Sequence, residues 1–377
     1  MTVMPLTPPA ESILELNRKA QHLQDHTLKQ EAETAGYPCP WIETPLIESA
    51  PLSKLAGCRI FLKMENFQPS GSFKSRGIGN LVLRAVQRSP HSTPRHFFSP
   101  SGGNAALACT TASTLLHQKS TVVVPTTTKP EMIQRILLAG ASEVIQHGRT
   151  IAEADSYLRT ELLSKDPCGV YVPPFDHRDI WDGAERLIHE VHTQMGGRPE
   201  GVVCSVGGGG LLIGLCQGLD RLSPSAPSSE SPRESEARAK TETGTKTQVI
   251  GVETIGCESF SKAIKAQQLV TLPNITSIAT SLGCTTVASK ALEYGLRSSV
   301  HSTLVSDREA IEACIRFAED HKVLVEPACG ATLALVYSGR LSEVMQLGRE
   351  DRVVLVVCGG SNVSVEMMSE WRRDLGV

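Results

Sequence analysis

Short apolar runs alternate with amphipathic segments along most of this 377-residue chain. Residues 121–124, 202–206 and 352–358 are apolar runs with the length of buried strands, whereas 78–86 repeats its apolar side chains at helical spacing. Consecutive parallel strands need helical crossovers, and these cover both faces of the sheet. The alternation therefore predicts an α/β fold with parallel sheets. Because the chain exceeds the usual size of one hydrophobic core, we expect two lobes.

The predicted elements follow one another in strand-helix order. Expected strands are 60–64, 96–99, 121–124, 143–146, 170–172, 202–206, 249–253 and 352–358. Expected helices are 74–86, 105–117, one from 130 closed by Gly140, one ending near 163, 181–192, one from 211, 259–266, 310–321, 329–337 and a terminal helix.

Composition marks the expected domain boundaries. Residues 1–36 are expected to be an N-terminal extension. Segment 223–248 is rich in Ser, Pro, Glu, Lys and Thr and cannot bury enough apolar surface to fold, so we expect a disordered surface insertion. We assign 37–67 and 178–377 to a large domain and 68–177 to a small domain.

Charge and cysteine content exclude several classes of protein. The 37 basic and 40 acidic residues give a net charge of −3 without a basic patch, so we expect no nucleic-acid partner. Eleven cysteines without a CxxC pair indicate reduced, buried thiols, and the histidines lack zinc-binding spacing. No run approaches the ~18 apolar residues that span a bilayer, and the acidic Glu11 and Glu15 suit neither a secretory signal nor a transit peptide. We therefore expect a soluble, cytoplasmic protein.

Lys74 lies in the segment KMENFQPSGSFKSRG, in a Ser/Gly turn between a predicted strand and a predicted helix. Free N–H groups and the positive dipole end at a helix start disfavour a second cation, so the position favours a neutral amine or an imine. A phosphate-binding P-loop needs glycine directly before the lysine, where this chain has Phe73. A solvated lysine at a helix start is the structural alternative.

Four Gly- or Ser-rich loops each follow a predicted strand and precede a predicted helix. Ligands of open α/β sheets bind beyond the carboxyl ends of the strands. We therefore expect these loops to gather at one sheet edge. Their sequences are PSGSFK, SPSGGN, GGGG and CGGSN.

The GGGG loop, residues 207–210, offers backbone N–H groups without side chains at the start of a helix, which suits a phosphate group. A dinucleotide fingerprint needs a third glycine at position 212 or 213, where this chain has Leu212 and Ile213. Glycines that only make a tight turn are the remaining alternative.

Six sequence motifs, and the order in which they follow one another, resemble the fold-type II pyridoxal-phosphate enzymes, and most closely the L-serine dehydratases. The resemblance covers 41–377 apart from the insertion. It implies a tryptophan synthase β-like fold with two open, twisted, mostly parallel sheets flanked by helices, and pyridoxal 5′-phosphate as cofactor. It also implies conversion of L-serine to pyruvate and ammonia, with L-threonine giving 2-oxobutanoate. The motifs are PSGSFKSRG, SPSGGNAALA, SVGGGGLLIG, VETIGCESF, VEPACGATLALVYSG and VVCGGSN.

The resemblance assigns roles around the cofactor. Lys74 would form the Schiff base and, once released, remove the α-proton of the substrate. Phe73 would lie against one face of the ring and Ser281 on the opposite side, while Asn104 would donate to the 3′-oxygen. A polar helix cap is a second role open to Asn104. The phosphate, which would assist departure of the β-hydroxyl, would be held by Gly207, Gly208, Gly209, Gly210 and Leu211.

By the same resemblance, Cys358 faces the pyridine nitrogen. A thiol, with a reference pKa of ~8.5, cannot keep that nitrogen protonated as a carboxylate does. This favours loss of the β-hydroxyl over transamination. A small buried thiol at a strand end is the structural alternative.

The SxGN loop is expected to bind the substrate. Ser101, with the N–H groups of its loop and Ser72, would bind the substrate carboxylate beside Asn104. Racemases of this fold place a serine where this chain has Gly102, which offers no acid or base. We therefore expect a dehydratase with little racemase activity.

The family commonly holds a monovalent cation beside the phosphate loop and commonly forms dimers. The matching carbonyls would suit K⁺, with Glu253 nearby as the charge. A capped or paired carboxylate is the alternative for Glu253. We also expect a homodimer. The carbonyl positions are Gly207, Cys257, Leu282 and Cys284.

Other functions remain open within this fold. A threonine dehydratase differs by one methyl group in its substrate, and sequence cannot rank the two. A β-replacement enzyme such as a cysteine synthase would need a second-substrate pocket and usually a serine at position 358. A serine racemase and a non-catalytic cofactor binder are further alternatives, although the intact Lys74 argues against the binder.

Overall fold

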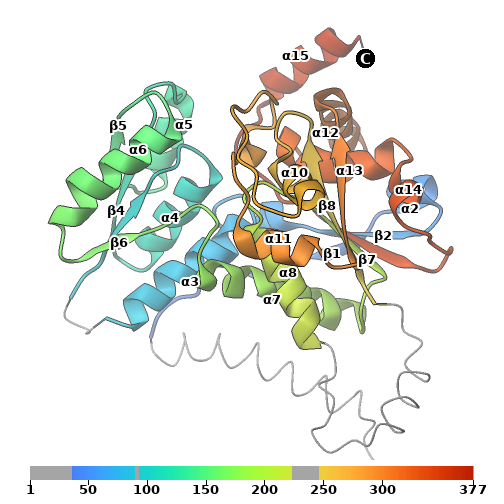
Figure 1. Cartoon of the computed structure of the whole chain (residues 1–377), viewed down its shortest axis with the longest axis horizontal. Helices are drawn as coiled ribbons and strands as arrows, with labels where there is room; N and C mark the ends of the chain where they lie inside the picture. The colour runs from blue at the N-terminus through green and yellow to red at the C-terminus, as the bar shows by residue number, and fades with distance from the viewer. Residues whose placement is uncertain (1–35, 90–92, 223–245, 377) are drawn as a thin grey trace, which may run out of the picture.

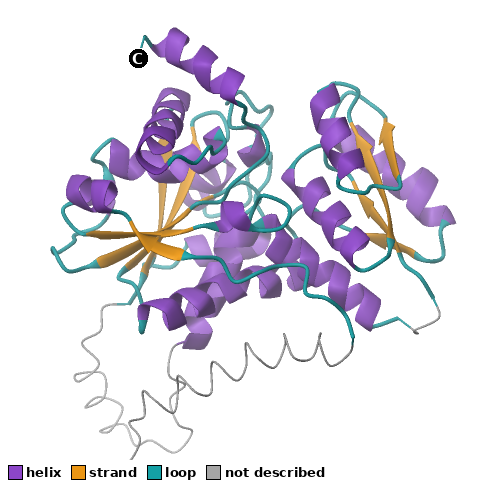
Figure 2. Cartoon of the chain, turned by 180° about the vertical axis from the view of Figure 1, so that it is seen from behind, coloured by secondary structure: helices purple, strands orange, loops and turns teal. Residues whose placement is uncertain are grey.

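The computed structural model describes residues 36–89, 93–222 and 246–376. Its strands form two separate sheets, each flanked by helices (Figures 1 and 2). The predicted α/β class with two mostly parallel sheets is confirmed. The expected extension, apart from Gly36, and most of the expected insertion lie outside the described residues.

The larger sheet has six strands in the order β1-β2-β10-β7-β8-β9. Only the pairing of β1 with β2 is antiparallel among the described strands. The central strand β7 is buried at every residue, as its apolar sequence predicts. The strands are β1 Leu46–Glu48, β2 Arg59–Lys63, β7 Gly201–Ser205, β8 Gln248–Thr254, β9 Val300–Val305 and β10 Arg352–Val356.

The smaller sheet has four parallel strands in the order β5-β4-β3-β6. It stands beside the larger sheet and carries α4, α5 and α6 (Figure 1). The strands are β3 His96–Ser99, β4 Lys119–Val124, β5 Glu143–Gln146 and β6 Gly169–Tyr171.

Two helices, α3 and α7, run beneath both sheets and connect them (Figure 1). Their backbones approach closely, because a Cβ on Gly183 would lie 2.4 Å from the Arg76 carbonyl oxygen. In the larger unit α13 is buried at every residue and packs against the strands. The α-helices are α2 Ala50–Ala56, α3 Lys74–Gln87, α4 Asn104–Leu115, α5 Pro130–Leu138, α6 Ile151–Tyr157, α7 Arg178–Met195, α8 Gly210–Leu222, α10 Ser259–Ala266, α11 Ser289–Gly295, α12 Asp307–His321, α13 Pro327–Tyr337, α14 Leu341–Val344 and α15 Val365–Leu375.

Short helical turns complete the fold: η1 Glu65–Phe67, η2 Leu158–Leu162, η3 Leu163–Lys165 and η4 Thr280–Leu282. The expected helix ending near 163 is therefore a composite of α6, η2 and η3, in which the backbone changes from α to wider and then tighter turns. The sequence interpretation missed β9, because its polar His301 and Ser302 interrupt the apolar pattern.

The insertion ends earlier than the sequence interpretation placed it. Thr247 is buried and its hydroxyl donates to the carbonyl oxygen of Pro199 at 2.8 Å. Gln248 already pairs with Gly201 in the sheet. The prediction that residues up to 248 belong to a disordered insertion was therefore wrong for 246–248, because sheet pairing orders a segment whose composition is polar.

Candidate active site

The four predicted loops do not lie at the edge of one sheet. Three of them follow β2, β7 and β10 of the larger sheet, whereas the SPSGGN loop follows β3 of the smaller sheet. Side-chain contacts join the two groups, since the Ser361 hydroxyl donates to Asn104 Oδ1 at 2.7 Å. The site therefore lies between the carboxyl ends of two sheets, which corrects the expectation of a single edge.

Lys74 is the first residue of α3, and Phe73 is the N-cap without a side-chain capping bond. Its Nζ donates to the carbonyl oxygen of Pro174 at 2.5 Å and lies 5.3 Å from the centre of the Phe73 ring. Burial lowers the pKa of the Lys74 amine to about 8, although the nearby Cys284 and Glu326 groups act in the opposite direction. A neutral amine, which is the nucleophilic form, is therefore accessible near neutral pH.

The tetraglycine loop packs so closely against its neighbours that a side chain at Gly208 or Gly210 would not fit. A Cβ on Gly208 would lie 2.2 Å from Cγ of Phe175, and a Cβ on Gly210 would lie 2.9 Å from the Phe175 carbonyl oxygen. Gly209 has φ +89°, a backbone conformation that favours glycine. Within the described part of the chain, no hydrogen bond uses the N–H groups of residues 207–211 as donors. Unused N–H groups at the start of α8 fit an anionic phosphate.

One segment, Pro174–Phe175, joins the lysine to the glycine loop. Pro174 accepts from Lys74, and the adjacent Phe175 packs against Gly208 and Gly210. The sequence interpretation missed this segment. Its position directly after the predicted strand 170–172 could have indicated it, because ligands bind at the carboxyl ends of strands. The segment has no glycine and was therefore not counted among the ligand-binding loops.

Asn104 is the first residue of α4 and connects the two sheets. Gly103 is the N-cap, so the alternative role of Asn104 as a helix cap does not apply. Asn104 Oδ1 accepts from the N–H of Ser361 at 3.0 Å, and Nδ2 donates to Oε1 of Glu326 at 3.0 Å. Ser281 Oγ lies 3.5 Å from Nδ2 and accepts from Asn362 Nδ2 at 3.1 Å. The structure thus brings two predicted cofactor residues together, and adds Glu326, which the sequence interpretation missed.

The expected substrate-binding residues lie on the two loops that carry Lys74 and Asn104. The buried hydroxyl of Ser72 has no hydrogen-bond partner among the described residues, and Ser72 forms an isolated bridge with Gly359. The Ser101 hydroxyl accepts from the N–H of Gly103 at 3.3 Å. A buried hydroxyl without a partner is costly, so Ser72 fits a polar ligand group at this position.

Cys358 follows β10 and is buried. Its backbone carbonyl accepts from the N–H of Phe73 at 3.1 Å, which ties the CGGSN loop to the lysine loop. Its thiol contacts the carbonyl oxygen of Val356 at 3.4 Å. Gly207 lies against the Ser281–Leu282 backbone, because a Cβ there would be 3.2 Å from the Ser281 carbonyl oxygen.

Glu253, the second-last residue of β8, has a buried carboxylate that caps the start of α10. Its two oxygens accept from the N–H groups of Phe260 and Ser261, each at 2.8 Å. Burial raises the pKa of Glu253 to about 8, although these two bonds lower it. The capped-carboxylate alternative therefore describes this side chain. No group of three or more His, Cys, Asp or Glu side chains in the described ranges is placed to hold a metal ion.

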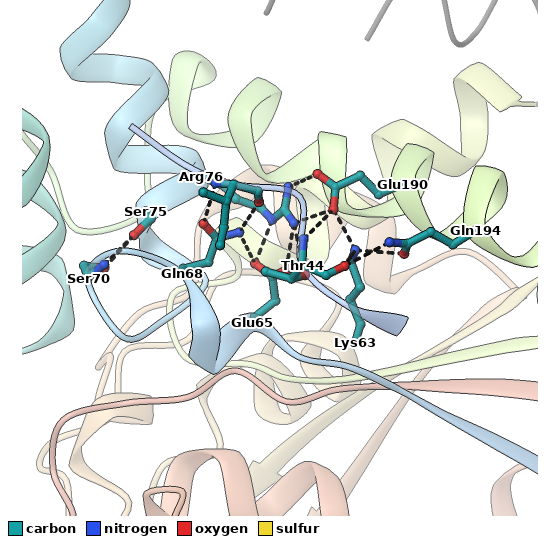
Figure 3. A network of polar contacts seen from close by, with 10 residues as sticks. Thr44, Lys63, Glu65, Gln68, Ser70, Ser75, Arg76, Glu190 and Gln194 are labelled. Carbon is teal, nitrogen blue, oxygen red and sulfur yellow. Dashed lines mark hydrogen bonds and ion pairs between the residues drawn. The ribbon is translucent and has the colours of Figure 1, made fainter. Parts of the chain in front are cut away.

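A buried ionic network anchors the start of α3 (Figure 3). Arg76 donates to both oxygens of Glu65, at 2.7 and 2.8 Å, and to both oxygens of Glu190, at 2.6 and 2.7 Å. Lys63 donates to Glu190 at 2.6 Å and to the carbonyl oxygen of Thr44 at 2.7 Å. The side chains of Lys63, Glu65 and Arg76 are fully buried. This network holds β2, η1 and α7 against the helix that begins with the lysine.

The lysine, the unused N–H groups of the glycine loop and the amide of Asn104 converge between two mostly parallel sheets. This is the architecture of an α/β enzyme that binds a phosphorylated cofactor. The chain belongs to the pyridoxal-phosphate dependent enzyme family, whose model matches residues 40–359. The resemblance noted in the sequence is thereby confirmed.

Individual relatives cover most of the chain. It is 41% identical to a bovine protein named L-serine dehydratase/L-threonine deaminase, over 89% of this chain and 96% of the bovine protein. It is 38% identical to the catabolic L-serine/threonine dehydratase of Saccharomyces cerevisiae, over 87% of this chain and 89% of the yeast protein. The crystal structure of an L-serine ammonia-lyase from Rhizomucor miehei is similar, with a TM-score of 0.78 and 36% identity over 89% of this chain and 99% of that one.

None of the helices in the described ranges combines the length and the apolar character needed to cross a bilayer.

Proposed function

We propose that this protein is a pyridoxal-phosphate-dependent L-serine ammonia-lyase, which converts L-serine to pyruvate and ammonia and also L-threonine to 2-oxobutanoate. The observation that carries the proposal is the convergence of Lys74 and the tetraglycine loop on the Pro174–Phe175 segment. Bovine, yeast and fungal relatives with serine dehydratase names support the substrate class.

Bound pyridoxal phosphate supplies an electron sink that stabilises negative charge at the substrate α-carbon. Around it, Lys74 takes the α-proton on its neutral amine. Ser72 and Ser101, with Gly102 and Asn104 beside them, bind the substrate carboxylate. The other cofactor-binding residues are Phe73, Ser281, Cys358 and Gly207, Gly208, Gly209, Gly210 and Leu211.

Product measurement tests the proposal. The purified chain, loaded with pyridoxal phosphate and given L-serine, should release pyruvate and ammonia in equal amounts. Formation of cysteine when sulfide is added, in place of pyruvate, would identify a β-replacement enzyme instead. If the chain binds pyridoxal phosphate but forms no product from L-serine or L-threonine, it is a non-catalytic cofactor binder and not an ammonia-lyase.

The two sheets are proposed to belong to two domains that enclose the site. Residues 37–67 and 178–377 make the large domain in this proposal, and 68–177 the small one. Separate hydrophobic clusters around the two sheets support this division, while a further cluster packs Trp41 and Ile180 of the large domain against Ile78 of the small one. Limited proteolysis that releases a stable fragment near these boundaries would agree with it, whereas cleavage spread evenly along the chain would contradict it.

A potassium ion is proposed beside the phosphate loop, bound by the carbonyls of Gly207, Cys257, Leu282 and Cys284. Burial raises the pKa of Glu253, and a nearby cation would favour its charged form. Glu253 would then supply negative charge near the ion while its oxygens accept from the N–H groups of Phe260 and Ser261. Equal activity in K⁺ and in tetramethylammonium would contradict this proposal.

We further propose a cytoplasmic homodimer. All eleven cysteines are free thiols, which suits a reducing compartment. Light scattering of the purified protein would show a mass near 81 kDa for a dimer, twice the 40.6 kDa of one chain.

A further inference from the structure

We infer that Glu326 is a positioning residue that fixes the amide of Asn104, so that one N–H of Asn104 faces the cofactor. This inference rests on the proposed function and assigns Glu326 a part in it. Glu326 lies directly before α13, is 3% exposed, and does not cap its own helix with its side chain. Its carboxylate points instead to the loops of both sheets.

Glu326 accepts hydrogen bonds from two loops. Oε1 accepts from Asn104 Nδ2 at 3.0 Å, and Oε2 accepts from the N–H of Asn362 at 3.1 Å. Burial raises the pKa of Glu326, while bonds from Ser281, Asn362 and Asn104 lower it. A buried carboxylate with this set of donors on both oxygens is held in one orientation.

The backbone of the CGGSN loop is shaped around this carboxylate. A Cβ on Gly360 would lie 2.0 Å from Cδ and 2.2 Å from Oε2 of Glu326, and Gly360 has φ +121°. Only glycine allows both this close approach and this backbone conformation. Gly360 also donates to the carbonyl oxygen of Gly71 on the lysine loop. The position of Glu326 is therefore coupled to the loop that precedes Lys74.

The side-chain amide of Asn104 keeps one N–H without a close hydrogen-bond acceptor. Oδ1 accepts from the N–H and the hydroxyl of Ser361, at 3.0 and 2.7 Å. The NH₂ group has two hydrogens, of which one is donated to Glu326. The other has only Ser281 Oγ at 3.5 Å, which is long for a hydrogen bond. One N–H is therefore available for an acceptor on the cofactor.

Glu326 also determines which way the amide faces. If the amide of Asn104 were flipped, its NH₂ group would meet the N–H of Ser361 and its oxygen would meet the carboxylate of Glu326. The contact with the N–H of Ser361 is repulsive, and the contact with Glu326 is repulsive when its carboxylate is ionised, so Ser361 and Glu326 together favour the observed orientation. Without Glu326, only Ser361 would determine the orientation of the Asn104 amide.

The test measures how tightly apo-protein binds pyridoxal phosphate, by fluorescence titration. Loss of one positioning hydrogen bond predicts about tenfold weaker binding for Glu326→Ala. Glu326→Gln keeps one oxygen that can accept from Asn104, so its binding should fall between that of the wild type and that of Glu326→Ala. The loaded Glu326→Ala enzyme should lose kcat while its KM for L-serine stays near the wild-type value.

Thr332→Val is the matched control on the same helix. It removes a buried hydroxyl of α13 whose hydrogen-bond partner is Ser205 Oγ at 2.5 Å, a residue of β7. We expect it to lower the unfolding temperature without changing cofactor affinity.

The outcomes separate this inference from the proposed function. Wild-type affinity in both Glu326 variants, or equal weakening in Thr332→Val, would overturn the role of Glu326 and leave the proposed function standing. Failure of the wild-type chain to bind pyridoxal phosphate would overturn the proposed function itself. If Glu326→Ala does not fold, Glu326→Gln decides, because its nearly equal volume preserves the packing against Gly360.

Discussion

Ser361 donates from its hydroxyl to Oδ1 of Asn104 at 2.7 Å, although the two residues follow strands of different sheets. Ser361 follows β10 of the larger sheet, and Asn104 follows β3 of the smaller one. Arg135 on α5 adds a second bond between the same units, to the carbonyl oxygen of Ser361. The site is therefore shared, and a change in either sheet unit should affect the whole of it.

Replacing Lys74 with alanine should abolish pyruvate formation. Loss of a positioned acid or base typically costs about 10² to 10⁴ in rate. The measurement is pyruvate release from L-serine with excess cofactor, alongside the unfolding temperature. Near wild-type turnover in a folded Lys74→Ala protein would exclude this lysine as the base.

Adding one methyl group to the tetraglycine loop should weaken cofactor binding. In Gly208→Ala the new Cβ would lie 2.2 Å from Cγ of Phe175, so the loop must move. We expect at least about tenfold lower affinity for pyridoxal phosphate, the cost of one lost charge-assisted bond. Gly197→Ala is the matched control, since the nearest atom there is 3.9 Å away. Equal affinity in the two variants would show that the loop does not hold the phosphate.

Removing Arg76 should destabilise the fold strongly. Arg76→Met leaves the carboxylates of Glu65 and Glu190 buried without their main partner, and breaking such a pair typically costs about 3–5 kcal/mol. Urea denaturation gives the free energy of unfolding. Arg308→Met removes an arginine whose side chain is 62% exposed and pairs with Glu312, which is 38% exposed, so it should cost only about 0–1 kcal/mol. Similar losses in both variants would mean that the network adds no special stability.

Glu253 should make the protein less stable as the pH rises. Its pKa is about 8 in the folded protein, compared with an ordinary value of 4.5, which we take for the unfolded chain. Between pH 4.5 and 8 the folded state therefore holds a proton that the unfolded state has released. Stability from this group is present below about pH 4.5 and is lost as the pH rises through about 8. The unfolding free energy of Glu253→Gln, relative to wild type, should therefore increase over this range.

Potassium provides the control for that titration. A bound cation near Glu253 would favour the charged carboxylate, so K⁺ should reduce the loss of wild-type stability near pH 8 and tetramethylammonium should not. A pH dependence that is the same in Glu253→Gln and wild type would show that this carboxylate has an ordinary pKa.

L-serine should yield far less D-serine than pyruvate. Gly102 offers no acid on the second face of the substrate, and a missing acid or base costs about 10² to 10⁴ in rate. Chiral chromatography of the remaining serine measures the ratio. Gly102→Ser should not simply restore racemisation, because its Cβ would lie 3.0 Å from Oγ1 and Cγ2 of Thr128. Comparable amounts of D-serine and pyruvate from the wild type would contradict the one-base interpretation.

Many elements could be predicted because their signals are local. The expected spans 96–99, 143–146 and 259–266 coincide with β3, β5 and α10, since their apolar spacing is read within a few residues. Lys74 and the tetraglycine loop were found for the same reason, because a Ser/Gly turn before a helix depends on adjacent residues. The strand β9 was missed because pairing with β8 orders it, and the end of the insertion was missed because Gln248 pairs with β7. The composition of these segments does not indicate either pairing.

The amino-acid sequence by itself determined most of the alternating strands and helices, the lysine that begins α3 and the bare backbone of residues 207–210. Only the tertiary structure decided that Pro174, Glu326 and Ser361 meet Lys74 and Asn104, and that Lys63, Glu65 and Arg76 are buried charges. The physical reason is that the arrangement of the two sheets brings together residues far apart in the sequence, such as Asn104 and Ser361, which are 257 positions apart. Such contacts depend on packing between elements, which leaves no periodic signal in the chain.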